Sequence, residues 1–391
     1  MRAIVLIDGE HYAPVVRDAL AALPYDVVGA LFVGGTEKLR GGDDYGVPLV
    51  AALDETEADL VVDLSDEPVL GPRERFLWAS RSLALGLPYV GADFRFEPPV
   101  LHDAPVPSLA VIGTGKRVGK TAVTGHVARL LARDRDVVVV SMGRGGPPEP
   151  ELRRTAPAVG ELVELARAGR HAASDYLETA VFAGVPSVGC RRAGGGLAGA
   201  PFDSNVLEGV HAAAALEPDL LVLDGSGAAL PPIAAQARIL VTNAAHDVRD
   251  GLNAYRVLVS DLVVDTGGAD HAAIRQIKDV PVVRAELRLR PAEPLRGRRT
   301  AVFTTGPAPT GHLEGDVVHV SRNLAHRDAL RAELAQVDAE VYLVELKAAA
   351  IDVVAEVALA RGAELVLAAN DVVADGLDEL LPDLVPIGAR A

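Results

Sequence analysis

The stretch Leu109-Ala-Val-Ile-Gly-Thr-Gly-Lys-Arg-Val-Gly-Lys-Thr121 decides the fold of this chain. Its first part, Leu109–Ile112, is an apolar run that predicts a buried strand, and a helical pattern begins near Val118. Glycines between a strand and a helix let the backbone turn so that successive N–H groups point at one anion. The N-terminus of the helix adds its positive end. The stretch therefore predicts a phosphate-binding loop (P-loop) for a nucleotide.

The loop is one residue longer than the common form, because Gly113 precedes Gly119 by six positions and Thr114 stands where the first glycine is usual. We expect Lys120 to reach the β- and γ-phosphates and the Thr121 hydroxyl to hold Mg²⁺. No Asn-Lys-x-Asp motif for reading guanine is present, which favours ATP. The expected nucleotide-binding residues are Gly113, Thr114, Gly115, Val118, Gly119, Lys120, Thr121 and Ala122, and the expected catalytic residues are Lys120, Lys116 and Arg117.

The rest of the chain alternates strands with helices. Most apolar runs are continuous, which is typical of parallel strands covered on both faces, and amphipathic stretches lie between them. The expected strands are Ala3–Ile7, Val27–Val33, Leu60–Leu64, Leu109–Ile112, Val137–Ser141, Leu220–Leu223, Ile239–Thr242, Leu262–Val264, Ala301–Thr304, Val317–Val320, Val341–Val344 and Leu365–Leu367. The pattern predicts an α/β protein whose P-loop domain has a mainly parallel sheet.

Two proline-rich stretches interrupt this alternation. Proline fixes φ and cannot continue a hydrogen-bonded ladder, so we expect extended linkers at Glu97–Ser108 and Arg290–Arg299. These linkers divide the chain into three predicted domains. They are a Rossmann-like α/β domain at 1–103, a P-loop NTPase domain at 104–292 and a C-terminal α/β domain at 293–391.

The composition limits the classes of partner. Lys plus Arg number 38 and Asp plus Glu number 54, so the net charge is −16, which argues against a protein that coats nucleic acid. No apolar run approaches the roughly 18 residues of a membrane span. Because Met1–Leu6 reads as a strand rather than a signal peptide, we expect a cytoplasmic protein with no membrane or nucleic-acid partner. The single cysteine, Cys190, has no neighbouring base in the sequence and is interpreted as structural.

A P-loop also needs an acidic residue near its metal ion. Leu220–Asp224 supplies one at the carboxyl end of a strand, which is the edge of a parallel sheet where ligands bind. Asp224 is therefore the expected Mg²⁺ residue beside Thr121, and an ordinary turn is the alternative interpretation. Glu149 is either a further metal ligand or a surface acid.

Positive charges follow other predicted strands. Ser141–Gly146 carries Arg144, and Cys190–Gly196 joins two arginines to a glycine-rich loop. Guanidinium forks bind phosphate oxygens in pairs, so these segments could hold a second anion beside the nucleotide; solvent-facing arginines are the alternative. His11 either contacts a phosphate or relays a proton, or it belongs to a turn capped by Asp8. The expected anion-binding residues are Arg144, Arg191, Arg192, Gly194, Gly195 and His11, with Lys116 and Arg117 from the P-loop.

Two families resemble the chain at these residues. The elongated loop GTGKRVGKT and the turn Asp224-Gly-Ser-Gly are similar to dethiobiotin synthetase, where Glu stands in place of Asp224, but that likeness stops at the P-loop domain. Nearly the whole chain resembles the cyclic 2,3-diphosphoglycerate synthetase family. The segments that carry this resemblance are IDGEHY (7–12), GTGKRVGKT (113–121), MGRGGPPEPE (142–151), GCRRAGGGLAG (189–199), DGSGAALPP (224–232) and ELKAAAID (345–352).

This resemblance implies an ATP- and Mg²⁺-dependent ligase that joins the two phosphates of 2,3-diphosphoglycerate into an intramolecular anhydride, releasing ADP and phosphate. It also makes K⁺ a candidate cofactor, and it implies that the outer domains cover the P-loop site and that the chain forms a homodimer. Lys120 and Mg²⁺ would stabilise the γ-phosphoryl group. The substrate phosphates would be held together by Lys116, Arg117, Arg144, Arg191 and Arg192.

Two other functions use the same residues. A nucleotide-switch ATPase, which positions a partner or delivers a metal, usually has its second lysine one position further from the P-loop lysine than Lys116 is from Lys120. A kinase of 2-phosphoglycerate would use the same pocket without closing a ring, and it would leave no free phosphate.

Overall fold

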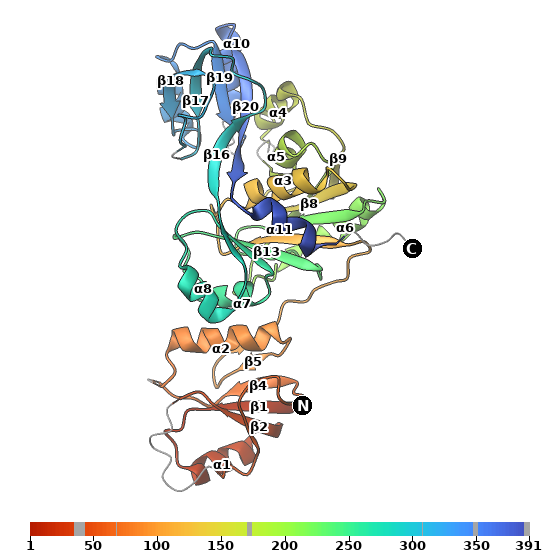
Figure 1. Ribbon diagram of the computed structural model, residues 1–391, viewed down its shortest axis with the longest axis vertical. Helices are drawn as coiled ribbons and strands as arrows, with labels where there is room; N and C mark the ends of the chain where they lie inside the picture. The colour runs from red at the N-terminus through yellow and green to blue at the C-terminus, as the bar shows by residue number, and fades with distance from the viewer. Residues whose placement is uncertain (35–43, 68, 170–173, 307, 347–350, 387–391) are drawn as a thin grey trace.

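The computed structural model describes residues 1–34, 44–67, 69–169, 174–306, 308–346 and 351–386. Within these residues the strands form three sheets, which follow one another along the long axis of an elongated molecule (Figure 1). The sheet with the N-terminal strands lies at one end, the sheet that carries the P-loop lies in the middle, and the C-terminal sheet lies at the other end. The prediction of an α/β fold with a P-loop domain and flanking α/β parts is confirmed.

The first sheet is parallel except for its last pair of strands. Its order is β3-β2-β1-β4-β5-β6, so that the order reverses between β1 and β4. Its helices are α1 (Ala13–Ala22) and α2 (Pro72–Ala84), and a proline at the first helical position of α2 has no helical N–H bond to lose. The strands are β1 (Arg2–Ile7), β2 (Asp26–Phe32), β3 (Leu49–Val50), β4 (Leu60–Asp63), β5 (Tyr89–Val90) and β6 (Arg95–Phe96).

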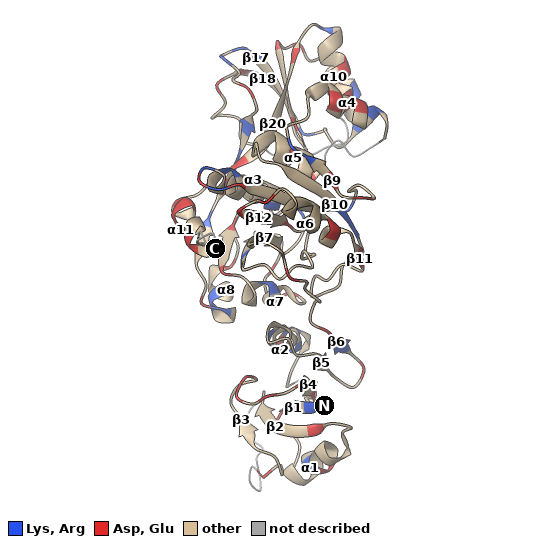
Figure 2. Ribbon diagram, turned by 90° about the vertical axis from the view of Figure 1, so that its right-hand side faces the viewer, with Lys and Arg blue, Asp and Glu red and all other residues tan. Residues whose placement is uncertain are grey.

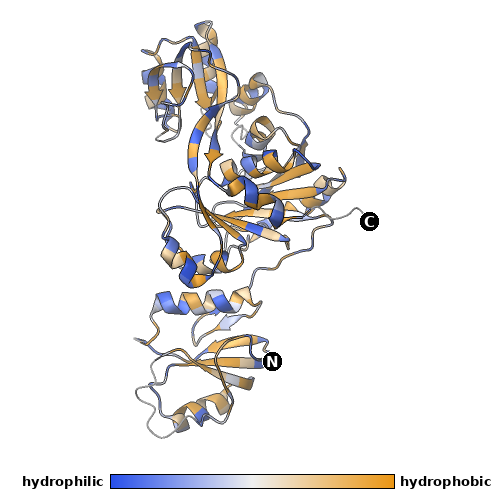
Figure 3. Ribbon diagram, in the orientation of Figure 1, coloured by the Kyte–Doolittle hydropathy of each residue, from blue (hydrophilic) through white to orange (hydrophobic). Residues whose placement is uncertain are grey.

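The second sheet has the order β11-β10-β8-β12-β7-β13-β14-β15, with β9 added to β10. Its strands are β7 (Ser108–Gly113), β8 (Val137–Gly143), β9 (Glu151–Arg153), β10 (Ser187–Ala193), β11 (Asp203–Ser204), β12 (Leu220–Asp224), β13 (Ala237–Thr242), β14 (Leu262–Asp265) and β15 (Val282–Arg284). Every residue of β7 and β12 is buried, and the strands of this sheet are mostly hydrophobic (Figure 3). The parallel register pairs Asp224 with Val111, which brings the carboxyl end of β12 beside the P-loop.

Helices cover both faces of the second sheet, and one of them packs against a helix of the N-terminal part. They are α3 (Lys120–Leu131), α4 (Val159–Arg167), α5 (Asp175–Phe182), α6 (Val206–Ala214), α7 (Asn253–Leu258) and α8 (His271–Ile277). Helix α2 of the N-terminal part packs against α7. Arg73 at the start of α2 donates to Asp250 at 2.9 Å and lies 3.5 Å from Asp247, just before α7. Figure 2 shows that the charged residues lie mostly on helices and loops, whereas the central strands carry few.

The third sheet has the order β16-β20-β19-β17-β18 and is attached to the helix that follows the P-loop. Its strands are β16 (Glu286–Pro291), β17 (Arg299–Phe303), β18 (Asp316–Ser321), β19 (Val341–Glu345) and β20 (Glu364–Val373), and its helices are α9 (Arg327–Leu334), α10 (Ile351–Ala360) and α11 (Leu377–Leu384). Helix α11 returns to the middle of the molecule, where Leu377 and Leu381 join the same core as Val123 of α3. An ion pair of 2.5 Å between Arg129 and Asp371 adds to this attachment.

All strands expected from apolar runs are present, but several others were not predicted. Strand β10 was missed because its sequence, Ser187–Ala193, contains a glycine and two arginines rather than a continuous apolar run. The second predicted linker is wrong in part, because Arg290 and Pro291 end β16, which pairs antiparallel with β20. The division at 1–103, 104–292 and 293–391 stays a prediction.

Residues 347–350 of the segment ELKAAAID lie outside the described residues. Among those that are described, no helix is both long and apolar enough to cross a membrane.

Candidate active site

The P-loop turns tightly between β7 and α3. Gly119 is the N-cap of α3 and has a φ of +82°, in the left-handed region that glycine adopts without strain. A Cβ at this position would lie 2.6 Å from Leu287 Cδ1, so a larger residue would collide with β16. The loop borders a cavity of about 430 Å³ that is lined by Gly115–Thr121 together with Asp175 and Gly227.

Side chains that follow β13 and β14 hold the backbone of the loop. Asn243 Nδ2 donates to the carbonyl of Arg117 at 3.2 Å, and His246 Nε2 lies 3.0 Å from the carbonyl of Lys116. Thr266 Oγ1 donates to the carbonyl of Val118, in the same loop, at 2.8 Å. Sequence reasoning missed these residues because they belong to no motif. The only signal was their place after strands that end at the same edge as β7.

Lys120 and Asp224 form a buried pair beneath the loop. Lys120 Nζ lies 2.5 Å from Asp224 Oδ1 and also donates to the carbonyl of Gly225. Thr124 Oγ1 donates to the same carboxylate oxygen at 3.1 Å. Burial raises the pKa of Asp224, the charge of Lys120 opposes this rise, and the charge of Asp175 adds to it. The second carboxylate oxygen, Asp224 Oδ2, is buried and has no hydrogen-bond partner.

The oxygen atoms at this place suit a magnesium ion. Mg²⁺ prefers carboxylate, hydroxyl and phosphate oxygens, and it usually binds through one or two protein carboxylates. Thr121 provides a hydroxyl in the cavity, and Asp224 Oδ2 is a buried acceptor that no protein group satisfies. The residues present therefore fit the ion that a P-loop implies. Glu149 is exposed and lines neither the cavity of the P-loop nor the small cavity beside it.

Three of the predicted cations converge on Gly227. A Cβ built there would lie 3.2 Å from Arg144 Nη2, 3.6 Å from Lys116 Cγ and 4.0 Å from Arg192 Nη2. We call Lys116, Arg144 and Arg192 the cation cluster. Within the described part of the chain, none of the three forms an ion pair with a carboxylate. Such a concentration of uncompensated positive charge beside a P-loop is typical of a site for a second anion.

Arg192 is the buried member of the cation cluster. Its Nη2 donates to the carbonyl of Ser226 at 2.9 Å, its Nη1 donates to the carbonyl of Gly194, and its Nε is buried without a partner. Burial lowers the pKa of Arg192, and the nearby charge of Arg144 lowers it further. A Cβ at Gly195 would lie 3.4 Å from Arg192 Nη1, so the glycine-rich loop passes close to this side chain.

Strand β10 separates the two arginines that the sequence places side by side. Successive residues of a strand point to opposite faces, and Arg191 is exposed whereas Arg192 is buried. Residues 190–193 are the end of β10, so the two arginines lie on a strand and the glycines follow it. The structure brings Arg192 to Gly227, and Arg191 points the other way.

Close backbone contacts place Arg144 beside β10. A Cβ at Gly146 would lie 2.0 Å from the carbonyl oxygen of Cys190, so the loop after β8 can pack against β10 only with glycine there. Asn205 fastens the same loop, since its Nδ2 donates to the carbonyl of Pro148 at 3.1 Å while its Oδ1 accepts from the N–H of Arg191 at 2.7 Å. Cys190 itself is buried, and burial raises the pKa of its thiol to about 12, as expected for a structural cysteine.

A buried arginine on α7 supports two segments next to the cation cluster. Arg256 is 2% exposed, and its Nε and Nη2 donate to the carbonyl of Ala228, next to Gly227, at 3.0 and 2.6 Å. Its Nη1 donates to the carbonyl of Leu197, in the glycine-rich loop, at 3.2 Å. Burial lowers the pKa of Arg256 to about 10. Sequence reasoning missed this residue, and no motif marks it.

His11 lies at the carboxyl edge of the first sheet. Its Nδ1 is 3.2 Å from Asp8 Oδ1, and its Nε2 is 3.4 Å from Asp66 Oδ2. Asp8 Oδ1 also accepts from the N–H of Glu10 at 2.9 Å, so the capped turn considered for this segment is present. A contact between His11 and a phosphate stays a prediction.

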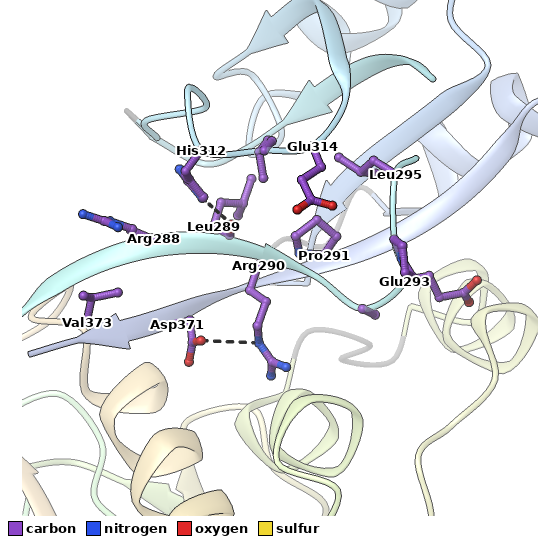
Figure 4. A pocket seen from close by; sticks show the side chains of 13 residues that line it. Arg288, Leu289, Arg290, Pro291, Glu293, Leu295, His312, Glu314, Asp371 and Val373 are labelled. Atoms are coloured by element: carbon purple, nitrogen blue, oxygen red, sulfur yellow. Dashed lines mark hydrogen bonds and ion pairs between the residues drawn. The ribbon is translucent and has the colours of Figure 1, made fainter. Parts of the chain in front are cut away.

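A further cavity of about 460 Å³ lies between β16, β20 and the loop around His312 (Figure 4). Two of its charged or titratable side chains, Arg290 and His312, have partners within the protein. Arg290 faces Asp371 at 3.8 Å and donates to the carbonyl of Phe182 at 2.8 Å, and His312 Nε2 lies 2.7 Å from the carbonyl of Leu289. The cation cluster, by contrast, is uncompensated.

Comparison with known proteins assigns this arrangement to a family. Models of three domains of cyclic 2,3-diphosphoglycerate synthetase match consecutive parts of the chain: the N-terminal domain at residues 2–97, the P-loop domain at 108–286 and the C-terminal domain at 291–371. The chain belongs to the cyclic 2,3-diphosphoglycerate synthetase family.

Relatives named cyclic 2,3-diphosphoglycerate synthetase match the chain over nearly their full length. The protein of Rubrobacter xylanophilus is 48% identical over 100% of this chain and 98% of its own. That of Thermococcus kodakarensis is 41% identical over 99% and 98%, and that of Methanothermus fervidus is 36% identical over 94% and 92%. Among solved structures, LpxK from Aquifex aeolicus in complex with ATP is similar with a TM-score of 0.44 and 16% identity, over 73% of this chain and 90% of that one.

Membership in the cyclic 2,3-diphosphoglycerate synthetase family confirms two predictions. The chain is an enzyme of the ligase class, and its P-loop belongs to a nucleotide-binding domain. The sequence segments on which the resemblance was based are spread along nearly the whole chain. The three matched domain models likewise cover most of it, from residue 2 to residue 371.

Proposed function

We propose that this enzyme uses ATP to close 2,3-diphosphoglycerate into its cyclic anhydride, releasing ADP and inorganic phosphate. The observation that carries this proposal is the cation cluster, Lys116, Arg144 and Arg192, which converges on Gly227 at the border of the P-loop cavity. A substrate with two phosphates and a carboxylate needs such a cluster in a protein whose net charge is −16.

The reaction would proceed in two displacements at phosphorus. An oxygen of one substrate phosphate attacks the γ-phosphorus of ATP, and the bond to ADP breaks. An oxygen of the other substrate phosphate then attacks the phosphorus of the first substrate phosphate. The ring closes as the bond to the terminal phosphoryl group breaks, and inorganic phosphate leaves. Transfers of this kind depend on positioning and on neutralising charge more than on acid–base catalysis.

Holding the two substrate phosphates together is the demanding task. Two unit charges 4 Å apart repel each other by about 4 kcal/mol at an effective dielectric constant of 20, and each phosphate carries more than one charge. Arg192, which is buried and already fixed by two carbonyls, can bind a phosphate without losing much side-chain freedom. Arg144 and Lys116 would bind from the neighbouring loops, and Arg117 would assist from the P-loop.

The nucleotide would bind along the P-loop, with Lys120 moving from Asp224 to the β- and γ-phosphates. Mg²⁺, held by Thr121 and Asp224, would neutralise charge on those phosphates. Asn243 and His246 fix the carbonyls of the loop, so its N–H groups stay directed toward the phosphates. A K⁺ ion and a homodimer stay predictions that rest on the family.

The proposal is tested by turnover with Mg·ATP and 2,3-diphosphoglycerate, following phosphate release and the ³¹P NMR spectrum of the acceptor. We expect one phosphate released per ADP formed and paired acceptor resonances shifted to anhydride positions. ATP hydrolysis that ignores the acceptor would overturn the proposal in favour of a nucleotide-switch ATPase. A phosphorylated acceptor without free phosphate would instead indicate a kinase.

A further inference from the structure

Asp175, which was not expected from the sequence, lies between the two cavities of the active site. It is the first residue of α5, it is partly exposed, and it lines the 430 Å³ cavity of the P-loop. It also lines a smaller cavity of about 80 Å³ that contains Arg144 and Gly146. Asp175 is the one residue that the linings of these two cavities share.

The contacts of Asp175 suit the binding of a metal cation, because its carboxylate accepts from a hydroxyl and pairs with no charged side chain among the described residues. Its Oδ1 accepts from Thr121 Oγ1 at 3.2 Å, which is the hydroxyl that a P-loop uses to hold Mg²⁺. Within the described residues, Asp175 forms no ion pair, although Lys120 lines the same cavity. A carboxylate beside this hydroxyl can enter the coordination shell of the same ion.

A second observation is the orphaned oxygen of Asp224. Asp224 is fully buried, its Oδ1 is taken by Lys120 and Thr124, and its Oδ2 has no hydrogen-bond partner. A buried carboxylate oxygen without a partner costs free energy, so its persistence calls for a ligand. Asp224 and Asp175 are close enough to influence each other electrostatically. Two such carboxylates and a hydroxyl are a donor set that a divalent cation prefers.

We propose that Asp175 is the second carboxylate that holds the divalent cation of the bound nucleotide, together with Thr121 and Asp224. This inference rests on the function proposed above, because it assumes a metal–nucleotide complex in the P-loop. It gives Asp175 the part that the sequence suggested for Glu149. Since Asp175 also lines the cavity of Arg144, the cation it holds lies where the nucleotide and the second anion meet.

The experiment measures cation binding rather than turnover. Mn²⁺ is the probe, and its free concentration is followed by electron paramagnetic resonance while it is titrated into the enzyme–ADP complex. We expect Asp175→Asn to weaken Mn²⁺ binding at least about tenfold, the size of loss seen when a group that supports a metal site is removed. The affinity for ADP in EDTA should change less than about threefold, because the P-loop stays intact.

Two further variants keep the test sharp. Asp134→Asn is a matched control, since Asp134 is exposed just beyond the other end of α3, and its Mn²⁺ affinity should equal that of the wild type. Glu149→Gln tests the competing residue. Equal Mn²⁺ affinity in Asp175→Asn and Asp134→Asn, or a loss in Glu149→Gln alone, would overturn the inference.

The outcomes also separate this inference from the proposed function. Loss of Mn²⁺ binding in Asp175→Asn, with no cyclic product from the wild type, would leave Asp175 as a metal ligand in an enzyme with another acceptor. Cyclic product from the wild type, with unchanged Mn²⁺ binding in the variant, would refute the role of Asp175 and leave the proposed function standing. If Asp175→Asn does not bind ADP in EDTA, it is replaced by Asp175→Glu, which keeps the negative charge. We then expect the Mn²⁺ affinity of Asp175→Glu to fall by less than tenfold.

Discussion

The carboxyl edges of the first and second sheets both gather charged side chains, but they balance them differently. At the first edge, Asp8 is bonded to His11 and to the backbone N–H groups of Glu10 and Asp66. At the second edge, Arg192 of the cation cluster donates to two carbonyls, and no described carboxylate forms an ion pair with any member of the cluster. A charge group that the protein satisfies by itself serves the fold, whereas one that it leaves unsatisfied needs a ligand. The difference supports the proposal that the chemistry takes place at the second edge.

The largest effect is expected from Lys120→Ala. Lys120 is the only cation in contact with Asp224 among the described residues, and in the proposed reaction it moves to the transferred phosphoryl group. Removing one positioned donor to a developing charge costs about 10²–10³-fold in rate, and we expect a loss at the upper end. Phosphate release at saturating substrates measures it. Lys278→Ala, which removes a lysine that donates to the carbonyl of Ser260, is the matched control. Turnover within tenfold of the wild type would contradict this role.

The neighbouring arginines of β10 give the sharpest form of the comparison. Arg192→Ala should raise the KM for 2,3-diphosphoglycerate by about 10–100-fold, because a hydrogen bond to a charged group contributes about 1.5–3 kcal/mol. Arg191→Ala should change it less than about threefold, because β10 turns that side chain to the other face. The KM for ATP should stay the same in both. Steady-state kinetics with each substrate varied in turn distinguishes these cases, and equal effects of the two variants would show that the cluster is not confined to one face.

Arg256→Lys tests whether the second edge depends on support from behind. Lysine keeps the positive charge but cannot donate to Ala228 and Leu197 at once, so the segments beside Gly227 and Gly195 should loosen. We expect a rise of about tenfold in the KM for 2,3-diphosphoglycerate, with little change in the KM for ATP. Arg256 acts as a positioning residue here. A rise in both KM values, or a loss that follows only the melting temperature, would indicate a general contribution to stability.

The sequence predicts the P-loop side of this edge far better than the anion side. Lys120 and Asp224 could be found because each belongs to a local pattern, a glycine loop or a strand end, that fixes its role. Arg192 and Asp175 depend on packing between segments distant in the chain. Strand β10 lacks a continuous apolar run, so the sequence did not indicate a strand there. The alternation of side chains that places Arg191 and Arg192 on opposite faces of the strand could therefore not be predicted. Asp175 is the first residue of a short helix, and it comes near Thr121 only because α5 packs beside α3.

The smallest effect on activity is expected at the first edge. Burial raises the pKa of Asp8, but hydrogen bonds from the N–H groups of Glu10 and Asp66, with His11, outweigh it, so the net pKa lies below the ordinary 3.8. The folded state therefore prefers the carboxylate, and this stabilisation is present above pH 3.8 and disappears as the pH falls through the lowered value. Asp8→Asn should lose about 1–2 kcal/mol of stability at pH 7, with turnover changed less than twofold.

The single tryptophan makes this measurement local. Trp78 lies on α2, so its fluorescence during urea unfolding follows the N-terminal part of the chain. The stability difference between Asp8→Asn and the wild type should be constant from pH 7 to pH 5 and should shrink below about pH 4, because the Asp8 carboxylate then binds a proton in the unfolded wild-type chain before it does so in the folded protein. A difference that persists unchanged at low pH would mean that the amide disrupts the turn by packing rather than by charge. A large loss of turnover would instead place the first edge in contact with substrate, as His11 would require if it binds a phosphate, and the contrast between the two edges would fail.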